Sequence, residues 1–278
     1  MTPAWDDVAD RLVAELRRLS ELAADSEQSG FDPELTTGLL LPALRAVWSR
    51  YFTGVVTGAE CIPARGAALV VANHAGTFPI DGLMLALAAY DEAPFPRHLR
   101  LLAADLVFRL PLVGPLARRF GVIRADRADA AALLEAGDLV GVFPEGFRGT
   151  GKLYDERHQL QRFGRGGFAS LAIRSGAPIV PAAIVGAEDS YPMLANIAPL
   201  ARWLGLPYFP VTPTFPWLGA LGFLPLPAKW RIEFCDPVDT IGLDPDDADV
   251  VAELAAQVRD TVQRHVDKLV AERGDPYR

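Results

Sequence analysis

A short apolar strand is predicted at GAALVVAN (residues 66–73) and a helix at GLMLALAAY (82–90), with the loop HAGTFPID (74–81) between them. The same alternation of strands and helices continues along the chain. Such alternation is typical of α/β sheets. We therefore expect an α/β fold, with a mixed central sheet flanked by helices. Further strands are expected at 99–104, 121–125, 138–146, 177–186 and 230–239, and helices near 105–119, 127–137, 163–176 and 246–272.

The N-terminal part has a different pattern. Apolar side chains at helical spacing predict an amphipathic helix over 5–24. Residues 35–56 are apolar but interrupted by a proline and two arginines, whereas a membrane span needs about 20 predominantly apolar residues. A helix that lies against a membrane or packs on the protein is expected there instead. We divide the chain into an N-terminal helical, membrane-contacting segment (1–56) and a second domain (57–278).

Residues 190–228 contain eight prolines and seven aromatic residues but one charged residue, Arg202. So many prolines exclude a regular membrane-spanning helix. Tryptophan and tyrosine favour the headgroup boundary of a bilayer, so this composition favours an interfacial surface or an acyl-chain groove. A buried loop that packs against the sheet is the alternative.

The net charge of −8 is unevenly distributed. Residues 1–34 carry nine acidic and three basic side chains, and residues 233–278 carry twelve acidic and five basic ones. Residues 35–232 between them carry fourteen acidic and nineteen basic side chains. A basic middle part is expected where a protein meets phosphates or anionic headgroups, although ordinary solvated helices at both ends also explain the pattern. A membrane surface is therefore an expected partner and a nucleic acid is not; the oligomeric state is left open.

Compartment is indicated by the cysteines and the first residues. Cys61 and Cys235 have no metal-ligand spacing, and two thiols in a chain of this length favour a reducing compartment over a disulfide. The start, MTPAWDDVADRL, lacks the basic and apolar regions of a secretory signal. We expect the cytoplasmic face of a membrane, with peripheral or monotopic attachment.

The loop after the first quoted strand carries a candidate site. His74 follows the strand, Asn73 precedes it, and Asp81 comes seven residues later, just before the helix. Ligand-binding loops of α/β sheets lie at the carboxyl ends of strands. A histidine there can act as a general base while a carboxylate fixes its tautomer and stabilises the imidazolium. A lone loop histidine is more often an ordinary polar residue, so His74 needs support from other segments.

A second candidate lies in VGVFPEGFRGTGK (140–152), where an apolar strand leads into Glu145 and Gly146, then Arg148 and Lys152. Two cations among glycines let the backbone approach a phosphate, and arginine adds a bidentate fork. A surface turn with Glu145 paired to Arg148 is the alternative.

Arg124, in RRFGVIRAD (118–126), reaches the same sheet edge if the strands are parallel. The sequence has no Gly-x-Ser-x-Gly nucleophile elbow, no Cys/His metal cluster, no P-loop and no Gly-x-Gly-x-x-Gly after a strand. Hydrolase, zinc enzyme and dinucleotide-binding classes therefore lack support.

Taken in order, these segments resemble the four motif blocks of the glycerol-3-phosphate and lysophosphatidate acyltransferase family, the PlsC-like lysophospholipid acyltransferases. The blocks are Asn-His…Asp, Phe-Gly-x-Ile-Arg, Phe-Pro-Glu-Gly-x-Arg and a Val-Pro strand. One feature departs from the family pattern, which has four residues between His and Asp, whereas six separate His74 from Asp81. The longer loop must bulge. It is similar to that of a divergent branch, the transmembrane-protein-68-like diacylglycerol acyltransferases, and leaves the acyl acceptor open.

The resemblance implies a glycerolipid acyltransferase fold and acyl transfer from a thioester, acyl-CoA or acyl carrier protein, to an alcohol, with no metal and no other cofactor. His74 would be the base and Asp81 its partner. The expected acceptor is a glycerolipid such as lysophosphatidate, in phospholipid biosynthesis. A neutral or glycolipid acceptor of the diacylglycerol type and a non-catalytic lipid-binding protein, its His–Asp pair too far apart, are the alternatives. Substrate binding would involve Asn73, Arg124, Glu145, Gly146, Arg148 and Lys152.

Overall fold

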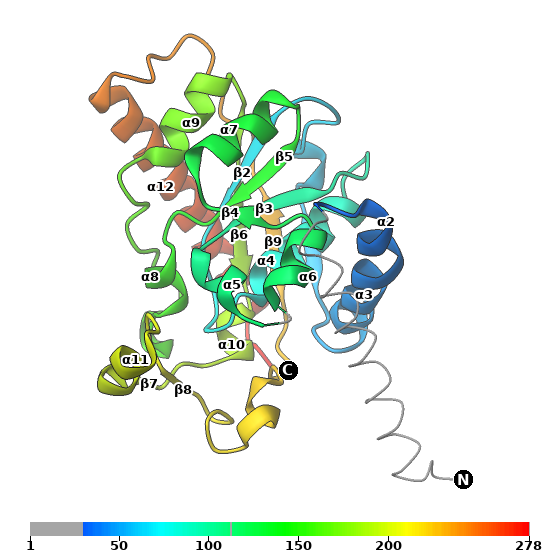
Figure 1. Ribbon diagram of the computed structural model, residues 1–278, viewed down its shortest axis with the longest axis vertical. Helices are drawn as coiled ribbons and strands as arrows, with labels where there is room; N and C mark the ends of the chain where they lie inside the picture. Colours follow the sequence, from blue (N-terminus) through cyan, green and yellow to red (C-terminus); the bar gives the residue numbers. More distant parts are fainter. Residues whose placement is uncertain (1–29, 112, 278) are drawn as a thin grey trace.

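The computed structural model describes residues 30–111 and 113–277. A seven-stranded sheet forms its centre (Figure 1). β9 runs antiparallel to β6 and the other neighbouring strands are parallel, so the predicted mixed sheet is confirmed. In spatial order the strands are β1 (Val55–Thr57), β9 (Arg231–Phe234), β6 (Ile179–Val185), β2 (Ala68–Ala72), β5 (Leu139–Val142), β3 (Leu99–Ala103) and β4 (Ile123–Arg124).

The two central strands, β2 and β6, are buried along their whole length. In β2, Leu69 and Val71 belong to the hydrophobic core on one face, whereas Val70 and Ala72 belong to the core on the other. A strand covered on both faces has no polar side, which explains the unbroken apolar runs in the sequence.

Helices cover both faces of the sheet (Figure 1). One layer contains α3 (Leu41–Arg50) and α4 (Ile80–Asp91), and the other contains α7 (Arg127–Glu135), α9 (Gly167–Ser175) and α12 (Ala248–Arg273). The last of these is capped by Asp247, whose carboxylate accepts from two backbone N–H groups of the first turn. Its fully buried Val258, Val262 and Val266 recur every four residues and face the sheet.

Most of the predicted elements are found within a few residues of their expected bounds. The helix expected near 105–119 is divided into α5 (Asp105–Arg109) and α6 (Val113–Arg119), because Leu110, which precedes a proline, is extended. β1 was not predicted, since three residues are too few to show a strand period. The remaining short elements are α2 (Pro33–Leu35), the π-helix η2 (Thr36–Leu40), α8 (Phe147–Thr150), α10 (Ala187–Ser190), α11 (Ala198–Leu204), the 3₁₀ turns η3 (Ala59–Cys61), η4 (Tyr154–Glu156) and η5 (Gly219–Phe223), and the strand pair β7 (Ala195–Asn196) and β8 (Pro210–Val211).

The described part of the N-terminal segment packs on the protein. Leu41 and Leu44 of α3 are buried in the same core as α4. Of the helices in the described ranges, none combines the length and the apolarity that a bilayer crossing requires. The amphipathic helix expected over 5–24 lies outside the described residues, and the division of the chain at residue 57 stays a prediction.

Candidate active site

Three central strands end at one edge of the sheet. β5 and β6 each run parallel to β2, so their carboxyl ends lie side by side. β2 leads into His74, β5 into Glu145, and β6 into Glu188. The segments that carry His74 and Glu145, both predicted to carry chemistry, therefore converge with the end of β6 at the position where α/β sheets bind their ligands.

His74 and Asp81 form a hydrogen-bonded pair. The imidazole Nδ1 lies 2.6 Å from Oδ2 of the fully buried Asp81 carboxylate. The same oxygen accepts from the N–H of Ala75 at 2.8 Å, and Oδ1 accepts from the N–H of Gly82 at 2.9 Å. The carboxylate sits in the first turn of α4, where the helix dipole favours negative charge. Because a carboxylate only accepts, Nδ1 carries the hydrogen and Nε2 keeps a free lone pair.

The imidazole is also held from its face. Phe143, just beyond β5, stacks on His74 with 4.5 Å between ring centroids and an interplanar angle of 25°. The His74 side chain stays 15% exposed. The ring is therefore fixed in orientation while one edge remains open to a substrate.

The six-residue loop between His74 and Asp81 bulges as predicted, and a distant segment holds it. Gly76 has φ +82°, and a Cβ there would lie 2.7 Å from the carbonyl oxygen of Ala187. Thr77 donates to the carbonyl of Tyr191 at 2.8 Å and accepts, through its own carbonyl, from the Tyr208 hydroxyl at 2.6 Å. The ring of the next residue, Phe78, contacts the rings of Tyr191, Phe215 and Phe223.

Asn73 joins the ends of two strands. Its amide nitrogen donates to the carbonyl of Ile184 at 2.9 Å, and its amide oxygen accepts from the N–H of the same residue at 2.7 Å. Both polar atoms of this buried side chain are thus used on the backbone of β6. The contact anchors β2 immediately before His74.

Glu145 organises the backbone around His74. One carboxylate oxygen accepts from the His74 N–H at 2.8 Å, and the other accepts from the Gln161 N–H at 2.6 Å and from Lys152 Nζ at 3.2 Å. Glu145 and Lys152 are both buried. Glu145 pairs with Lys152 in a buried ion pair, rather than with Arg148 in the surface turn that was the alternative.

The glycines after Glu145 were predicted to let the backbone approach a phosphate. In the structure, Gly149 lets the backbone of α8 approach His74. A Cβ at Gly149 would lie 2.6 Å from Cβ of His74 and 2.8 Å from Cβ of Glu145. Gly149 thus lets α8 contact the candidate base directly. Gly146, with φ +54°, makes the turn between the strand end and α8.

The two remaining predicted cations are exposed. Arg148 lies on the surface of α8. Arg124 Nε donates to Oδ1 of Asp105 at 2.9 Å, and this bond lowers the pKa of the Asp105 carboxyl. β4 is three strand positions from β2, roughly 14 Å at the usual spacing of strands, so Arg124 reaches the same edge without contacting His74.

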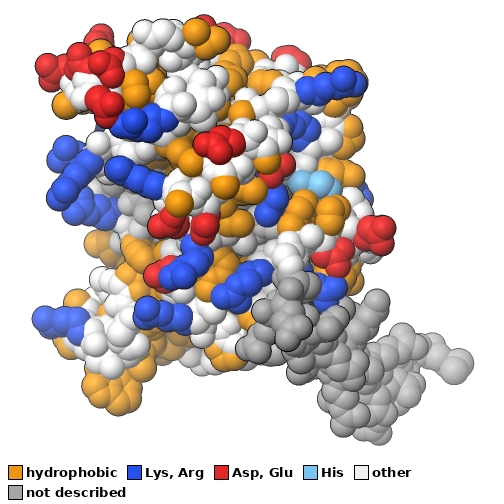
Figure 2. Space-filling model, turned by 45° about the horizontal axis from the view of Figure 1, so that its top comes forward, with side chains coloured by type: hydrophobic (Ala, Val, Ile, Leu, Met, Phe, Trp, Pro, Cys, Tyr) orange, Lys and Arg blue, Asp and Glu red, His pale blue; other side chains and the backbone are white. Residues whose placement is uncertain are grey.

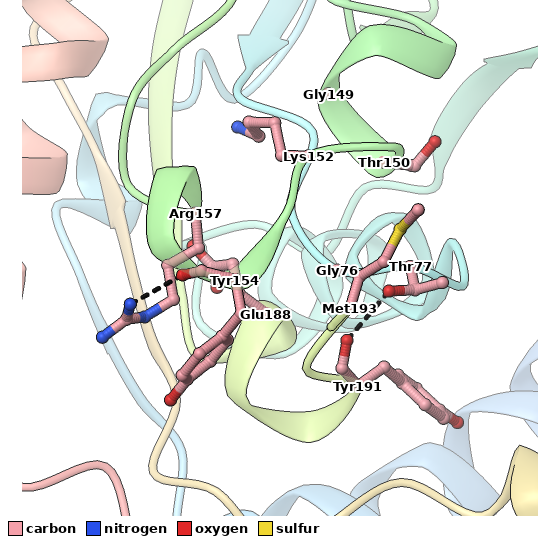
Figure 3. A pocket seen from close by; sticks show the side chains of 10 residues that line it. All are labelled: Gly76, Thr77, Gly149, Thr150, Lys152, Tyr154, Arg157, Glu188, Tyr191 and Met193. Atoms are coloured by element: carbon pink, nitrogen blue, oxygen red, sulfur yellow. Dashed lines mark hydrogen bonds between the residues drawn. The ribbon is translucent and has the colours of Figure 1, made fainter. Parts of the chain in front are cut away.

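A small polar cavity adjoins the His74 loop (Figure 3). Gly76 and Thr77 line one side of it, and Gly149 and Thr150 line another. The carboxyl group of Glu188 borders the cavity, and burial together with the neighbouring Asp189 raises its pKa to about 7. One oxygen of Glu188 accepts from the Gly186 N–H at 2.9 Å, while the other has no partner among the described residues.

The sequence reasoning missed Glu188 and Asp189. Asp189 is fully buried, forms an ion pair with Arg273 of α12 at 2.6 Å and accepts from the Tyr154 hydroxyl at 2.8 Å. It therefore joins the carboxyl end of β6 to the C-terminal helix and to the segment after α8. The available signal was a pair of adjacent acids three residues beyond a fully apolar strand, because a carboxylate that close to the core needs a partner.

Within the described residues, no group of three or more His, Cys, Asp and Glu side chains is placed to hold a metal ion. A histidine paired with a buried carboxylate at a strand end is typical of enzymes that activate a hydroxyl group by general-base catalysis. The site and the fold together define this class of enzyme.

Comparisons with known proteins narrow the class to a family. The acyltransferase family model matches residues 55–185. A protein of Mycobacterium tuberculosis described only as uncharacterized is 52% identical over 250 residues, which cover 89% of this chain and 70% of the relative. The chain belongs to the acyltransferase family and is an acyltransferase.

Two further matches support this assignment. The DGAT1/2-independent enzyme synthesizing storage lipids of Bos taurus is 30% identical over 84% of this chain and 64% of its own length. The crystal structure of the 1-acyl-sn-glycerophosphate acyltransferase PlsC from Thermotoga maritima is similar in fold, with a TM-score of 0.56, 24% identity, and coverage of 90% of this chain and 88% of that one. The predicted resemblance is thus confirmed. The alternative of a non-catalytic protein required His74 and Asp81 to be too far apart to bond. They lie within hydrogen-bonding distance, so the structure does not support it.

Proposed function

We propose that this acyltransferase moves a fatty acyl group from a thioester, acyl-CoA or acyl carrier protein, to a hydroxyl of a glycerolipid such as lysophosphatidate. The observation that carries the proposal is the 2.6 Å bond between His74 Nδ1 and Asp81 Oδ2, which leaves Nε2 available at the open edge of the ring. Neither a metal nor another cofactor is needed for this reaction.

In the proposed reaction, Nε2 of His74 removes the proton of the acceptor hydroxyl as its oxygen attacks the thioester carbon. The new C–O bond forms and the C–S bond breaks. The imidazolium, stabilised by Asp81, then returns the proton to the departing thiolate. A general base of this kind accelerates such reactions typically by 10²–10⁴-fold.

A second, mostly apolar cavity lies between the layer of α3 and α4 and strand β3, and we propose that it accommodates part of an apolar donor or acceptor chain. Phe143, which stacks on His74, packs against the same core that contains Leu101 of β3. Leu101, Leu41 of α3 and Leu83 of α4 line the cavity, most of whose other lining side chains are also apolar. Ligand pockets in proteins are lined predominantly by apolar side chains of this kind.

The test is thioester-dependent acylation of a panel that contains glycerol-3-phosphate, several lysolipids and diacylglycerol, read by mass spectrometry. His74→Ala should abolish product formation with every acceptor that the wild type uses. His265→Ala is the matched control, because His265 also pairs with a carboxylate, Glu233, but lies on α12. Wild-type turnover by His74→Ala would overturn the proposal.

A neutral acceptor is the second candidate, and two observations favour it. The bovine relative is described as synthesising storage lipids. In addition, Lys152 and Arg124 are already paired with Glu145 and Asp105, which leaves Arg148 as the best-placed predicted cation for a phosphate. A phosphorylated acceptor predicts that Arg148→Ala raises its KM at unchanged KM for the thioester. An unchanged acceptor KM favours diacylglycerol or another neutral lipid.

Such a reaction requires access to membrane lipids and to soluble thioesters. We therefore place the enzyme at the cytoplasmic face of a membrane, attached as a peripheral or monotopic protein. Fractionation of cells that express the full chain, followed by carbonate and detergent extraction, tests this placement.

A further inference from the structure

Segment 190–228 exposes many large apolar side chains on its outer side. They form two groups, one on and around α11 and one around η5, and both project from the end of the molecule where the carboxyl edge of the sheet lies (Figure 1). A soluble monomer rarely exposes so much apolar surface without a partner. We call these side chains the apolar face; they are 40–81% exposed and comprise Leu194, Ile197, Trp203, Leu204, Trp217, Leu218, Leu221, Phe223 and Leu224.

Segment 190–228 carries only positive charge. The segment contains no aspartate or glutamate, and its single charged side chain, Arg202, is exposed beside Trp203 on α11. Arg148 of α8 is also exposed, next to the 44%-exposed Phe147, and the end of α8 lies against the ring of Tyr208. Apolar and basic side chains lie together at the lower left of Figure 2.

Two exposed tryptophans, one of them next to an arginine, fit a lipid surface better than a protein partner. Trp203 and Trp217 are 81% and 70% exposed. Tryptophan partitions to the headgroup boundary, and arginine is attracted to anionic headgroups. The many prolines keep the helical and extended elements of this segment short, so its side chains can enter a bilayer interface without a long helix.

The inner side of the same segment holds the His74 loop. Tyr208 and Tyr191 bond Thr77, and Phe78 is enclosed by rings that include Phe223. Phe223 thus contacts the loop and is also 51% exposed on the apolar face. Whatever covers this face lies directly beside the candidate active site.

We propose that the apolar face docks on a lipid bilayer, with Trp203 and Trp217 at headgroup level and the carboxyl edge of the sheet turned toward the membrane. This orientation gives a lipid-borne hydroxyl a short path to His74. The orientation rests on the proposed function, whereas the docking itself does not depend on catalysis.

The experiment is flotation of the full chain with phosphatidylcholine vesicles, with and without phosphatidylglycerol. The double variant Trp203→Ser/Trp217→Ser and the single variant Leu221→Asp remove apolar contacts from the face. Ile241→Asp is the matched control, because Ile241 is 77% exposed in the loop between β9 and α12, far from the apolar face. We expect tighter binding of the wild type to the anionic vesicles, a loss on the order of tenfold or more in the face variants, and no loss in the control.

Acyl transfer supplies a second measurement. The face variants should turn over a short-chain, water-soluble acceptor as the wild type does, and should lose activity toward an acceptor embedded in vesicles. Vesicle binding by an inactive wild-type enzyme would reject the proposed function and leave the docking intact. Equal vesicle binding by wild type and face variants would overturn the docking. So would self-association that the same substitutions abolish, because it would assign the face to a second copy of the chain.

Discussion

Asp81 uses both carboxylate oxygens, and this makes its role testable at the scale of a single residue. Asp81→Asn keeps the shape, but an amide nitrogen in place of Oδ2 cannot accept from His74 Nδ1 or from the N–H of Ala75. The imidazole would then lose its orienting partner and the charge that stabilises its protonated form. We expect kcat to fall by about 10²–10⁴-fold at similar KM.

Steady-state kinetics of Asp81→Asn, with thermal unfolding measured in parallel, separates the catalytic loss from a folding defect. Asp91→Asn serves as the control, because Asp91 forms a surface ion pair with Arg45 at the other end of α4. Turnover of Asp81→Asn equal to that of the control would remove Asp81 from the mechanism.

Gly149→Ala tests the close contact between α8 and His74. The added methyl group would lie 2.9 Å from the carbonyl oxygen of His74, and still closer to its Cβ, so backbone must move. Overpacking of this kind costs about 1–3 kcal/mol. We expect a lower midpoint in urea unfolding and a lower kcat. Gly38→Ala, where no atom lies within 4 Å of the added Cβ, should leave kcat unchanged and should not lower the midpoint, because alanine is the better helix former.

At the scale of elements, the site depends on how the ends of β2 and β6 are joined. Asn73→Ala removes both bonds to Ile184 and leaves a buried N–H and a buried carbonyl without these partners. We expect a loss of about 2–4 kcal/mol in the free energy of unfolding, measured by urea denaturation. Asn196→Ala, which removes one exposed bond to the Phe209 N–H, should cost much less. Equal losses would show that the joint between the two strands is unimportant.

Local patterns predicted the elements but not the contacts between them. The unbroken apolar strands and the placement of His74 and Asp81 could be read from the sequence because both are set within a few residues. The partner of Asn73 could not, since Ile184 lies 111 residues away. The glycines after Glu145 predicted close approach, yet only the packing of α8 shows that Gly149 approaches His74. The roles predicted for Arg148, Arg124 and Lys152 remain to be tested with substrates.

At the scale of the whole molecule, the buried Glu188 and the half-buried His158 respond to pH in opposite directions. The pKa of Glu188 is raised to about 7, chiefly by burial, so its contribution to stability is full below the ordinary value of 4.5 and is lost as the pH rises through 7. Burial lowers the pKa of His158 to about 4, so its contribution is full above its ordinary value of 6.5 and is lost as the pH falls through 4. The two effects offset one another between these values.

Glu188→Gln should expose this compensation. The variant keeps the shape of the side chain but removes its titration. The stability that His158 loses as the pH falls is then no longer offset by a gain from Glu188. We expect its melting temperature to fall more steeply than that of the wild type between pH 6.5 and 4.5. The stability of the wild type relative to the variant should decline as the pH rises toward 7. Parallel melting curves for the two proteins across this range would contradict the assignment.

Phe78 is enclosed by aromatic rings that come from a segment far along the chain. Loop length and segment 190–228 are therefore not free to diverge separately during evolution. A descendant with a four-residue loop would leave a hole among Tyr191, Phe215 and Phe223, and one without the segment would leave Phe78 in water. We expect relatives to inherit both features or neither, and a chimera that exchanges only one of them to fold poorly.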